Sequence, residues 1–317
     1  MRGMAETWSV VLAAGEGNRL RTLTTTRQGL VIPKQYCSIN RSSCLLQDAL
    51  KRAATVAMPS HVCTVVADQH RRWWTSAIAG LNESNVFVQP RDKGSAYGIL
   101  LALLKLEMRN PSAIVTLLPA DHYFRDEEAI TRVLRIAGNL ASANPDATYL
   151  LGTDPEGPDA ALGYILPVEK ALDKPAGIVG FTEKPTTDYA RELLSVGALC
   201  NLFILAGSVG ALLELFEEDY AEKVGQMREA MNCQVAGDRQ SLDKFYASVA
   251  PIDFALDVLE VQATRLQVLR VPNCGWTDLG TPQRVEATVR RMGASGDSVR
   301  RHIGTNSPLF FDLAGQH

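Results

Sequence analysis

The chain has 317 residues, of which 46% are apolar and 21% are charged, and its formal net charge is -3. Such a chain can bury one large core, or a large core with a smaller appendage. It has no long Lys/Arg run, whereas sequence-independent binding of nucleic acid needs a dense basic face, so small molecules are the expected partners. The longest apolar stretches are too short to cross a bilayer, and Met1–Ser9 has no signal-peptide apolar region. We therefore expect a cytoplasmic protein with no membrane partner.

The cysteines indicate neither a metal site nor a redox pair. They lie far apart in the sequence and no two form a CxxC pair, which is the usual spacing of zinc ligands and of redox dithiols. Free thiols that pack as small apolar groups are the simplest interpretation. The six residues are Cys37, Cys44, Cys63, Cys200, Cys233 and Cys274.

In the first half of the chain, short β-type runs alternate with amphipathic stretches. Ser43 is placed to cap the first predicted helix, and Asn110–Pro111 should end the second, because proline has no amide to continue the helix. This alternation predicts a parallel α/β sheet. The expected strands are Ser9–Ala13, Val62–Ala67, Asn85–Val88 and Ala113–Leu118, and the expected helices lie near Leu45–Ala54 and Tyr97–Met108.

From Ala147 onward the predicted strands come closer together, which indicates a mixed sheet region covering one side of a cleft. Residues Ser208 to Phe245 look mainly helical. The tail Gly293–His317 has the weakest pattern, but Ser307–Phe311 is apolar enough to dock on the body or on a partner chain, so a homodimer stays open. The strands expected here are Thr148–Leu151, Gly163–Pro167, Ile178–Thr182, Leu199–Leu205 and Leu266–Val271, before a last helix near Pro282–Met292.

The first predicted strand runs directly into a loop of small residues, Ala13-Ala14-Gly15-Glu16-Gly17-Asn18-Arg19-Leu20. Small residues let backbone amides approach the phosphates of a ligand. Leu20 replaces the third glycine of the dinucleotide fingerprint and the GK[ST] ending of a P-loop is missing, so NAD-type and Walker-type sites are disfavoured. Arg19, and later Lys34, instead offer fixed positive charges for a triphosphate. From this loop alone, a tight strand-to-helix turn with solvated basic residues remains the alternative.

Together with Pro33-Lys34-Gln35, the segment from Leu12 to Leu20 resembles the signature of the sugar nucleotidyltransferases, and it is most similar to that of the mannose-1-phosphate guanylyltransferases. The resemblance implies a Rossmann-like α/β fold with a mixed, mainly parallel central sheet. It implies a catalytic domain over residues 1–292, with a nucleotide-binding part at about 1–145 and a sugar-phosphate-binding part at about 146–292. Further family-like segments follow in the expected order: Gln89–Ala96, Pro119–His122, Gly163–Ile165, Phe181–Pro185 and Gly275–Gly280.

Two aspartates are the candidates for binding a metal. Asp121 follows an apolar run at the expected C-terminal end of a central strand, where ligands bind in open α/β sheets. Asp278 lies between two glycines, beside Trp276. Taken alone, they could equally be a helix-capping aspartate and an Asx-turn residue. The resemblance implies instead that both hold the ion that bridges the nucleotide and sugar phosphates, and hard carboxylate oxygens suit Mg²⁺.

The resemblance also assigns the remaining site residues. It implies Arg19 on the leaving pyrophosphate, Lys34 near the α-phosphate and Lys184 on the sugar phosphate. A solvated surface lysine is the alternative for Lys184 and a helix N-cap is the alternative for Asp253. The implied nucleotide-binding residues are Leu12, Ala13, Ala14, Gly15, Gly17, Gln89, Lys93, Gly94 and Ser95, and the implied sugar-phosphate-binding residues are Gly163, Glu183, Lys184, Asn201 and Asp253.

The implied reaction joins a nucleoside triphosphate, best matched by GTP, to a hexose 1-phosphate, best matched by mannose 1-phosphate. A sugar 1-phosphate has a second pKa near ~6, so its oxygen is already ionised at neutral pH and needs no general base. The protein must then supply position and positive charge. His122, Trp73 and Trp74 are accordingly predicted to pack rather than react. A transferase for another base or phosphate, such as a polyol-phosphate cytidylyltransferase, and a non-catalytic regulatory relative that binds nucleotide-sugar are the alternatives.

Overall fold

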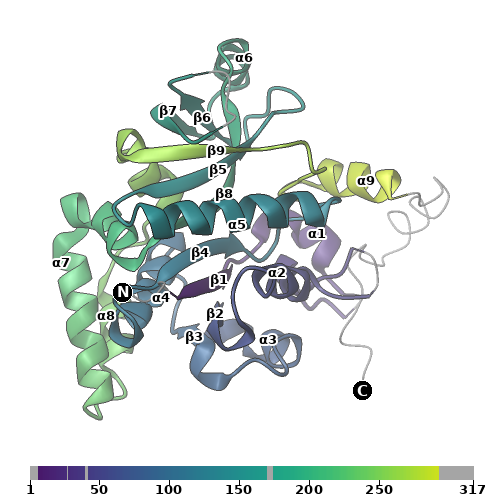
Figure 1. The fold of residues 1–317 in the computed structure, drawn as a ribbon. Helices are drawn as coiled ribbons and strands as arrows, with labels where there is room; N and C mark the ends of the chain where they lie inside the picture. The colour runs from purple at the N-terminus through teal and green to yellow at the C-terminus, as the bar shows by residue number, and fades with distance from the viewer. Residues whose placement is uncertain (1–5, 27, 40–41, 170–173, 293–317) are drawn as a thin grey trace.

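A computed structural model of the chain describes residues 6–26, 28–39, 42–169 and 174–292. Within these residues, nine strands form one sheet with the order β3-β2-β1-β4-β8-β5-β9-β7-β6 (Figure 1). The strands are β1 (Thr7–Ala13), β2 (Val62–Ala67), β3 (Val86–Gln89), β4 (Ile114–Pro119), β5 (Thr148–Thr153), β6 (Gly163–Pro167), β7 (Ala176–Glu183), β8 (Leu199–Ser208) and β9 (Leu266–Val271).

The sheet is mixed, as predicted, but the expectation that it is mainly parallel is wrong: among the described residues four strand pairs are parallel and five are antiparallel. Strand β1 pairs in parallel with β2 and β4, and β2 pairs in parallel with β3. Strand β8 is antiparallel to both β4 and β5, whereas β5 is parallel to β9. The pairs β6–β7 and β7–β9 are antiparallel. The parallel α/β pattern thus holds for the first four strands, and the second half of the sheet is reached through an antiparallel strand.

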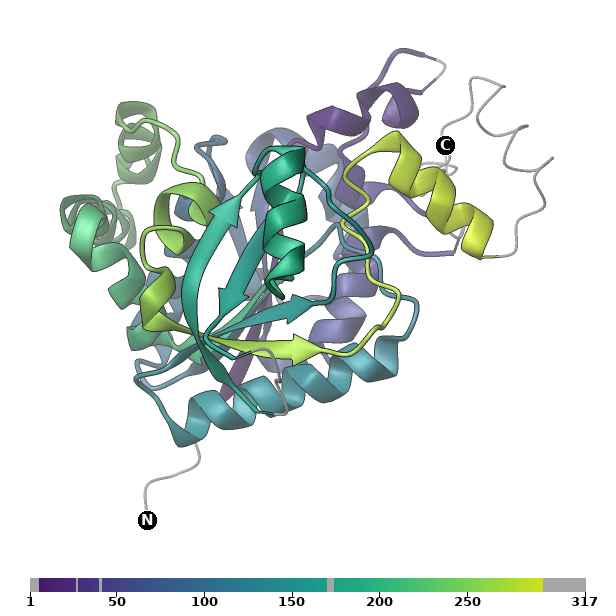
Figure 2. The ribbon, with the colours of Figure 1, turned by 90° about the horizontal axis from the view of Figure 1, so that it is seen from above.

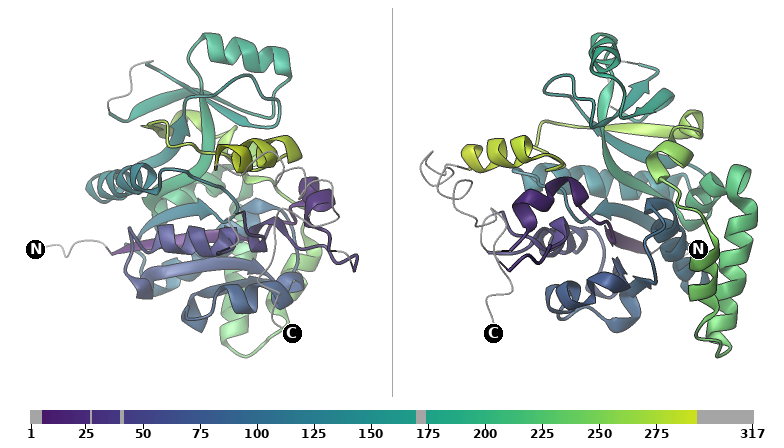
Figure 3. Two further views of the ribbon diagram at one scale, coloured as in Figure 1. Left: turned by 90° about the vertical axis from the view of Figure 1, so that its right-hand side faces the viewer. Right: turned by 180° about the vertical axis from the view of Figure 1, so that it is seen from behind.

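Helices cover both faces of this sheet, and alternate residues of the strands point to opposite cores. In β1, Val10 packs into the core under α4, α7 and α8, whereas Val11 packs into the core under α2, α3 and α5. Figure 2 shows α5 and the α7–α8 pair on different sides of the sheet, and Figure 3 shows α6 at the end of the sheet that carries β6 and β7. The helices are α1 (Arg21–Thr24), α2 (Leu45–Ala53), α3 (Arg71–Ala77), α4 (Ser95–Arg109), α5 (Glu127–Ala143), α6 (Thr187–Ser195), α7 (Val209–Val235), α8 (Ser241–Ser248) and α9 (Pro282–Arg291).

Two helix ends test the sequence predictions directly. Asn110 is the C-cap of α4, as predicted. The cap expected of Ser43 is wrong by one residue: Cys44 is the N-cap of α2, and its amide donates to Oε1 of Gln47 at 3.1 Å. Gln47 therefore completes a reciprocal capping box that a serine one position earlier cannot form.

Two further outcomes concern whole segments. Among the described residues, no helix is both long and apolar enough to cross a bilayer. The tail predicted at residues 293–317, with its apolar segment, lies outside the described residues.

Candidate active site

Two adjoining cavities open at the C-terminal ends of the parallel strands. The first cavity has a volume of about 330 Å³ and is lined by the loop after β1, the end of β3 and the start of α4. The second cavity has a volume of about 320 Å³ and is lined by β6, the end of β7 and the segment after β9. The two cavities share a boundary made by Ser95, Asp121, His122, Phe203 and Asp253. One ligand could therefore span both.

The loop after β1 is held from below by a short 3₁₀ helix, Lys34–Tyr36. The Gln35 amide donates to the carbonyls of Ala13 at 2.9 Å and Gly15 at 2.8 Å, and the Tyr36 hydroxyl donates to Ala13 at 3.1 Å. Gly17 has φ +66°, and a Cβ there would lie 2.9 Å from Cβ of Lys34. Only glycine fits this left-handed position without strain. These contacts explain why the two first motifs of the sequence form one structural unit.

Lys34 links the two predicted metal-binding aspartates. Its side chain is 5% exposed, and its Nζ donates to Oδ2 of Asp121 at 2.8 Å and to the main-chain carbonyl of Asp278. The segments that carry the aspartates are also paired, because Tyr123 and Thr277 exchange two main-chain hydrogen bonds of 3.0 Å. Both aspartates line the second cavity. The structure thus brings together two residues that are far apart in the sequence.

The surroundings keep both carboxylates ionised. Burial raises the pKa of Asp121, but the Lys34 ammonium and its hydrogen bond outweigh burial, so the pKa lies below its usual value. Burial also raises the pKa of Asp278, but the charges of Arg284 and Lys34 outweigh burial, so this pKa too lies below its usual value. Burial lowers the pKa of His122 to about 4, and the neutral ring accepts a hydrogen bond from Nε1 of Trp276 at 3.1 Å. This bond agrees with the packing role predicted for His122.

Each aspartate keeps one carboxylate oxygen that could bind an ion. Among the described residues, Oδ1 of Asp121 has no side-chain partner nearer than Nε2 of the neutral His122, at 4.0 Å, and the one ion pair of Oδ2 of Asp278 is with Arg19, at 3.9 Å. Two hard oxygens fit Mg²⁺, which usually takes one or two carboxylates and completes its shell with water and substrate phosphates. No cluster of three or more His, Cys, Asp or Glu side chains suited to a metal occurs within the described ranges. An ion held by these two oxygens would take its remaining ligands from water and substrate.

The far side of the second cavity carries Lys184, whose side chain is half exposed and contacts Oε1 of Glu183 at 2.9 Å. Lys184 has φ +49°, an uncommon conformation for a residue other than glycine. Glu183 is mostly buried, and burial raises its pKa despite the neighbouring lysine. A Cβ on Gly163 would lie 2.4 Å from Oε2 of Glu183. Glycine at this position therefore leaves room for the carboxylate beside the lysine.

Asn201 and Asp253 complete the wall of the second cavity, and both have partners within the protein. Oδ1 of Asn201 accepts from the amide of Phe203 at 2.8 Å. Oδ1 of Asp253 accepts from the amides of Ala255 and Leu256 at 2.9 and 3.3 Å, at the start of a short helix, Phe254–Leu259. The N-cap expected as an alternative for Asp253 is thus present, and a contact with sugar stays a prediction.

The loop between β3 and α4 forms the outer wall of the first cavity. Gln89 is 1% exposed, and its Nε2 has no hydrogen-bond partner among the described residues. Buried polar groups are nearly always paired, but this donor is covered by the protein and does not open into the cavity. Gly94 has φ +87°, and a Cβ there would lie 2.2 Å from the carbonyl oxygen of Ile252. Ser95 Oγ accepts from the amide of Phe254 at 2.8 Å, which fixes the start of α4.

Most predicted site residues line one of the cavities, but three do not. Lys93 was predicted at the base, whereas its ammonium donates to the Val249 carbonyl at 2.7 Å and ties the loop to the body. Ala13 is buried and binds Gln35 and Tyr36, and Lys34 lies beneath the two aspartates. The predicted residues that line the first cavity are Leu12, Ala14, Gly15, Gly17, Gln89, Gly94, Ser95, Asp121 and Asp253, and those that line the second are Arg19, Ser95, Asp121, Gly163, Glu183, Lys184, Asn201, Asp253 and Asp278.

The sequence analysis missed Arg284, in the first turn of α9. Its Nη1 contacts Oδ1 of Asp278, and its Nε and Nη2 contact Oδ2 of Asp159, the former at 3.1 Å. The pKa of Arg284 is raised: burial alone would lower it, but the two carboxylates outweigh burial. Its position shortly after Asp278, at the start of a helix, was the available signal.

A glycine-containing loop after the first strand, a basic residue beneath it and two carboxylates at the edge of a mixed sheet are together typical of α/β proteins that bind nucleotide phosphates. The family model described as nucleotidyl transferase matches residues 8–291. The chain therefore belongs to the nucleotidyl transferase family.

Curated relatives and a solved structure agree with this family. The alginate biosynthesis protein AlgA of Pseudomonas putida is 24% identical, over 86% of this chain and 56% of that protein. A putative mannose-1-phosphate guanylyltransferase of Vibrio cholerae is 25% identical, over 86% of this chain and 58% of that protein. The chain thus spans a little over half the length of these relatives. The crystal structure of mannose-1-phosphate geranyltransferase from Thermus thermophilus shares 25% identity and a TM-score of 0.72, over 87% of this chain and 76% of that chain.

Proposed function

We propose that the protein transfers a nucleotidyl group from a nucleoside triphosphate to a hexose 1-phosphate, which yields a nucleotide-sugar and pyrophosphate. The observation that carries this proposal is the convergence of Asp121 and Asp278 on Lys34, at the boundary of two cavities that meet at a shared wall. A reaction between two phosphates needs two adjoining subsites with charge at their junction, and this arrangement offers both.

The residues divide the work by position. The loop from Leu12 to Gly17, with Gln89 and Ser95, would hold the nucleotide in the first cavity. Arg19 and Lys184, whose side chains are about half exposed, would meet phosphates in the second cavity. Arginine suits a leaving pyrophosphate because its planar fork can bind two phosphate oxygens at once. The sugar phosphate is already ionised near neutral pH, so no residue has to remove a proton from it.

Asp121 and Asp278 would hold Mg²⁺ through the oxygens that the protein leaves open. When bound, the ion would supply positive charge between the phosphates of the two substrates. Lys34 holds the two aspartates together from below, and its own charge would lie close to the same phosphates. These residues can act without a side chain that gives or takes a proton.

We propose GTP and mannose 1-phosphate as the preferred substrates. The names of the curated relatives support this pair. Gln89 and Asp92 line the same cavity, so an amide donor and a carboxylate acceptor would lie near a base bound there. Guanine presents a carbonyl oxygen beside N–H donors, so it fits a donor next to an acceptor.

Pyrophosphate release tests the proposal across GTP, UTP, CTP, ATP and dTTP, each with a panel of sugar 1-phosphates and one polyol phosphate. The expected result is the highest kcat/KM for GTP with mannose 1-phosphate. A higher kcat/KM for UTP or dTTP would overturn the assignment of guanine as the preferred base but would leave the proposed nucleotidyl transfer unchanged. Tight binding of nucleotide-sugar without pyrophosphate release from any pair would favour the regulatory alternative instead.

A further inference from the structure

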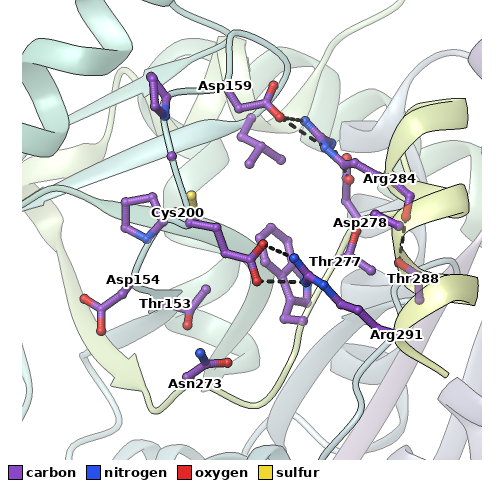
Figure 4. Close-up of a pocket in the computed structure, with 17 residues that line it drawn as sticks. Thr153, Asp154, Asp159, Cys200, Asn273, Thr277, Asp278, Arg284, Thr288 and Arg291 are labelled. Carbon is purple, nitrogen blue, oxygen red and sulfur yellow. Dashed lines mark hydrogen bonds and ion pairs between the residues drawn. The ribbon is translucent and has the colours of Figure 1, made fainter. Parts of the chain in front are cut away.

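A third cavity, of about 310 Å³, lies behind the wall of the second cavity, between the β5–β6 loop and α9 (Figure 4). Leu162, Trp276 and Asp278 line both cavities and so form part of the wall between them. Arg284 lines the third cavity but is not among the residues that line the second. It therefore reaches Asp278 from the side opposite to the proposed substrates.

The guanidinium group of Arg284 bridges two carboxylates. Figure 4 shows it between Asp159 and Asp278, with contacts to Oδ2 of the first and Oδ1 of the second. The amide of Gly280 also donates to Oδ1 of Asp278, at 2.9 Å. Both partners of Asp278 thus bind the same oxygen. Oδ2 is left on the side of Arg19, which lies 3.9 Å away.

Asp159 connects this contact to Lys184. The Tyr164 hydroxyl donates to the carbonyl of Asp159 at 3.0 Å and accepts from its amide at 2.9 Å, which holds the residue in the β5–β6 loop. In the same loop, the Leu162 carbonyl accepts from the amide of Lys184 at 3.1 Å. Arg284 therefore bridges the aspartate on one side of the second cavity and the loop that supports the lysine on the other side.

We infer that Arg284 is a positioning residue: it fixes Oδ1 of Asp278 from the third cavity and so presents Oδ2 to a divalent cation. This inference rests on the proposed function, because it takes Asp278 as a metal-binding residue. A carboxylate held by two donors on one oxygen loses its freedom to rotate, so its second oxygen is preorganised for an ion. Partners of this kind orient metal ligands, and their replacement typically costs about 10–100-fold in metal affinity or activity.

Arginine suits this role better than lysine. Its fork carries donors in a fixed plane, so one side chain can bind Asp159 and Asp278 at the same time, whereas an ammonium is a point charge on a flexible stem. The matched control is Arg291, which lies on the same helix, lines the same cavity and pairs with Glu156 at 2.8 Å. Arg291 has a similar charge and location but is not paired with Asp278.

The experiment measures Mn²⁺ binding to the full chain by electron paramagnetic resonance of the free ion, with and without GTP. It compares the unmodified protein with Arg284→Ala, Arg284→Lys and Arg291→Ala, and adds guanidinium chloride at low concentration to each. We expect the affinity for Mn²⁺ to fall about 10–100-fold in Arg284→Ala and also to fall in Arg284→Lys. Guanidinium should restore part of the loss in Arg284→Ala only. Arg291→Ala should bind within about twofold of the unmodified protein.

The outcomes separate this inference from the proposed function. Equal or tighter Mn²⁺ binding in both Arg284 variants would overturn the positioning role, and tighter binding would show that the arginine competes with the ion. An equal loss in Arg291→Ala would also overturn it, because the effect would then follow from charge alone. If the unmodified protein binds no Mn²⁺ and transfers no nucleotide, the proposed metal site itself fails. If Arg284→Ala does not fold, Arg284→Lys decides, since it keeps the charge and most of the packing.

Discussion

The two lysines of the site occupy opposite environments. Lys34 is 5% exposed and is bound by Asp121 and by the main chain at Asp278, so its charge is part of the folded structure. The side chain of Lys184 is half exposed, and its ammonium pairs only with Glu183 among the described residues. A buried charge is costly unless it is paired, whereas an exposed lysine is free to exchange its partner for a phosphate. Replacement of Lys34 and replacement of Lys184 should therefore affect different properties of the protein.

Lys184→Ala should raise the KM for the sugar 1-phosphate more than the KM for the nucleotide. Loss of one hydrogen bond to a charged group typically costs about 1.5–3 kcal/mol, which is roughly a 10–100-fold rise. Steady-state kinetics with each substrate varied in turn measure both constants. Lys34→Ala, run beside it, should lower kcat and thermal stability instead. Weaker nucleotide binding alone in Lys184→Ala would place this lysine on the other phosphate.

His122 should make the metal-free protein sensitive to mild acid. Its pKa falls from 6.5 to about 4 on folding, because burial disfavours the charged ring. Between these values only the unfolded chain binds the proton, so the stabilisation is complete above about pH 6.5 and is lost progressively toward pH 4. The full loss is about 3 kcal/mol. Urea unfolding in EDTA at pH 7 and pH 4.5 should show this loss in the unmodified protein and a smaller one in His122→Asn. The same pH dependence in both proteins would contradict the assignment.

At the scale of elements, the site depends on two chain segments that leave the sheet side by side. The segment after β4 carries Asp121, the segment after β9 carries Asp278, and the Tyr123–Thr277 pair joins them. Strand β8 is antiparallel to both β4 and β5, and β9 is parallel to β5. Strands β4 and β9 therefore run in the same direction and end at the same edge of the sheet. The order of the strands thus brings the carboxylates together.

Asp121→Asn and Asp278→Asn should each lower kcat by about 10²–10³, because each removes one charge from the same proposed ion site while keeping the shape. The kcat of the double variant should be little lower than that of the less active single variant, because both changes damage the same proposed ion site. Initial rates at saturating substrates over a Mg²⁺ titration measure all three losses. Losses that multiply, or full Mg²⁺-dependent activity in Asp278→Asn, would favour the turn-residue alternative.

Strands and long amphipathic helices could be predicted because their patterns are local. Val62–Ala67, Gly163–Pro167 and Leu266–Val271 have the predicted bounds. The sequence analysis missed α5, although Asp126 caps it and apolar residues such as Ile130 and Leu134 recur at helical spacing. The sheet order could not be derived from local patterns, because the antiparallel insertion of β8 depends on contacts between distant strands.

Sequence motifs could predict only those residues of the site that lie within the motifs. Residues within the motifs, such as Gly17 and Asp278, line the two cavities, and their contacts with substrate or metal stay predictions. Lys93 turns away from the first cavity because the Val249 carbonyl lies within its reach. Arg284 was missed because its role depends on Asp159, a residue of another segment, and spacing alone does not show such a pair.

In the whole molecule, a hydrophobic core packs against each face of the one sheet, and the two cavities open along one edge of that sheet. The first cavity is built mainly by residues up to 122 and the second mainly by residues after 160, so the proposed function gives each substrate a subsite on a different part of the chain. The aspartates and Lys34 lie where the two parts meet. The proposed reaction is therefore direct transfer of the nucleotidyl group between the two subsites.

Phosphorus NMR of one reaction mixture tests this claim most directly. The unmodified protein, GTP, mannose 1-phosphate and Mg²⁺ should give a pyrophosphate diester and free pyrophosphate in equal amounts, and omission of the sugar phosphate or addition of EDTA should abolish both signals. Reversal on addition of excess pyrophosphate should regenerate GTP. Release of inorganic phosphate and GDP, or no change in either substrate while the protein remains folded, would contradict the account.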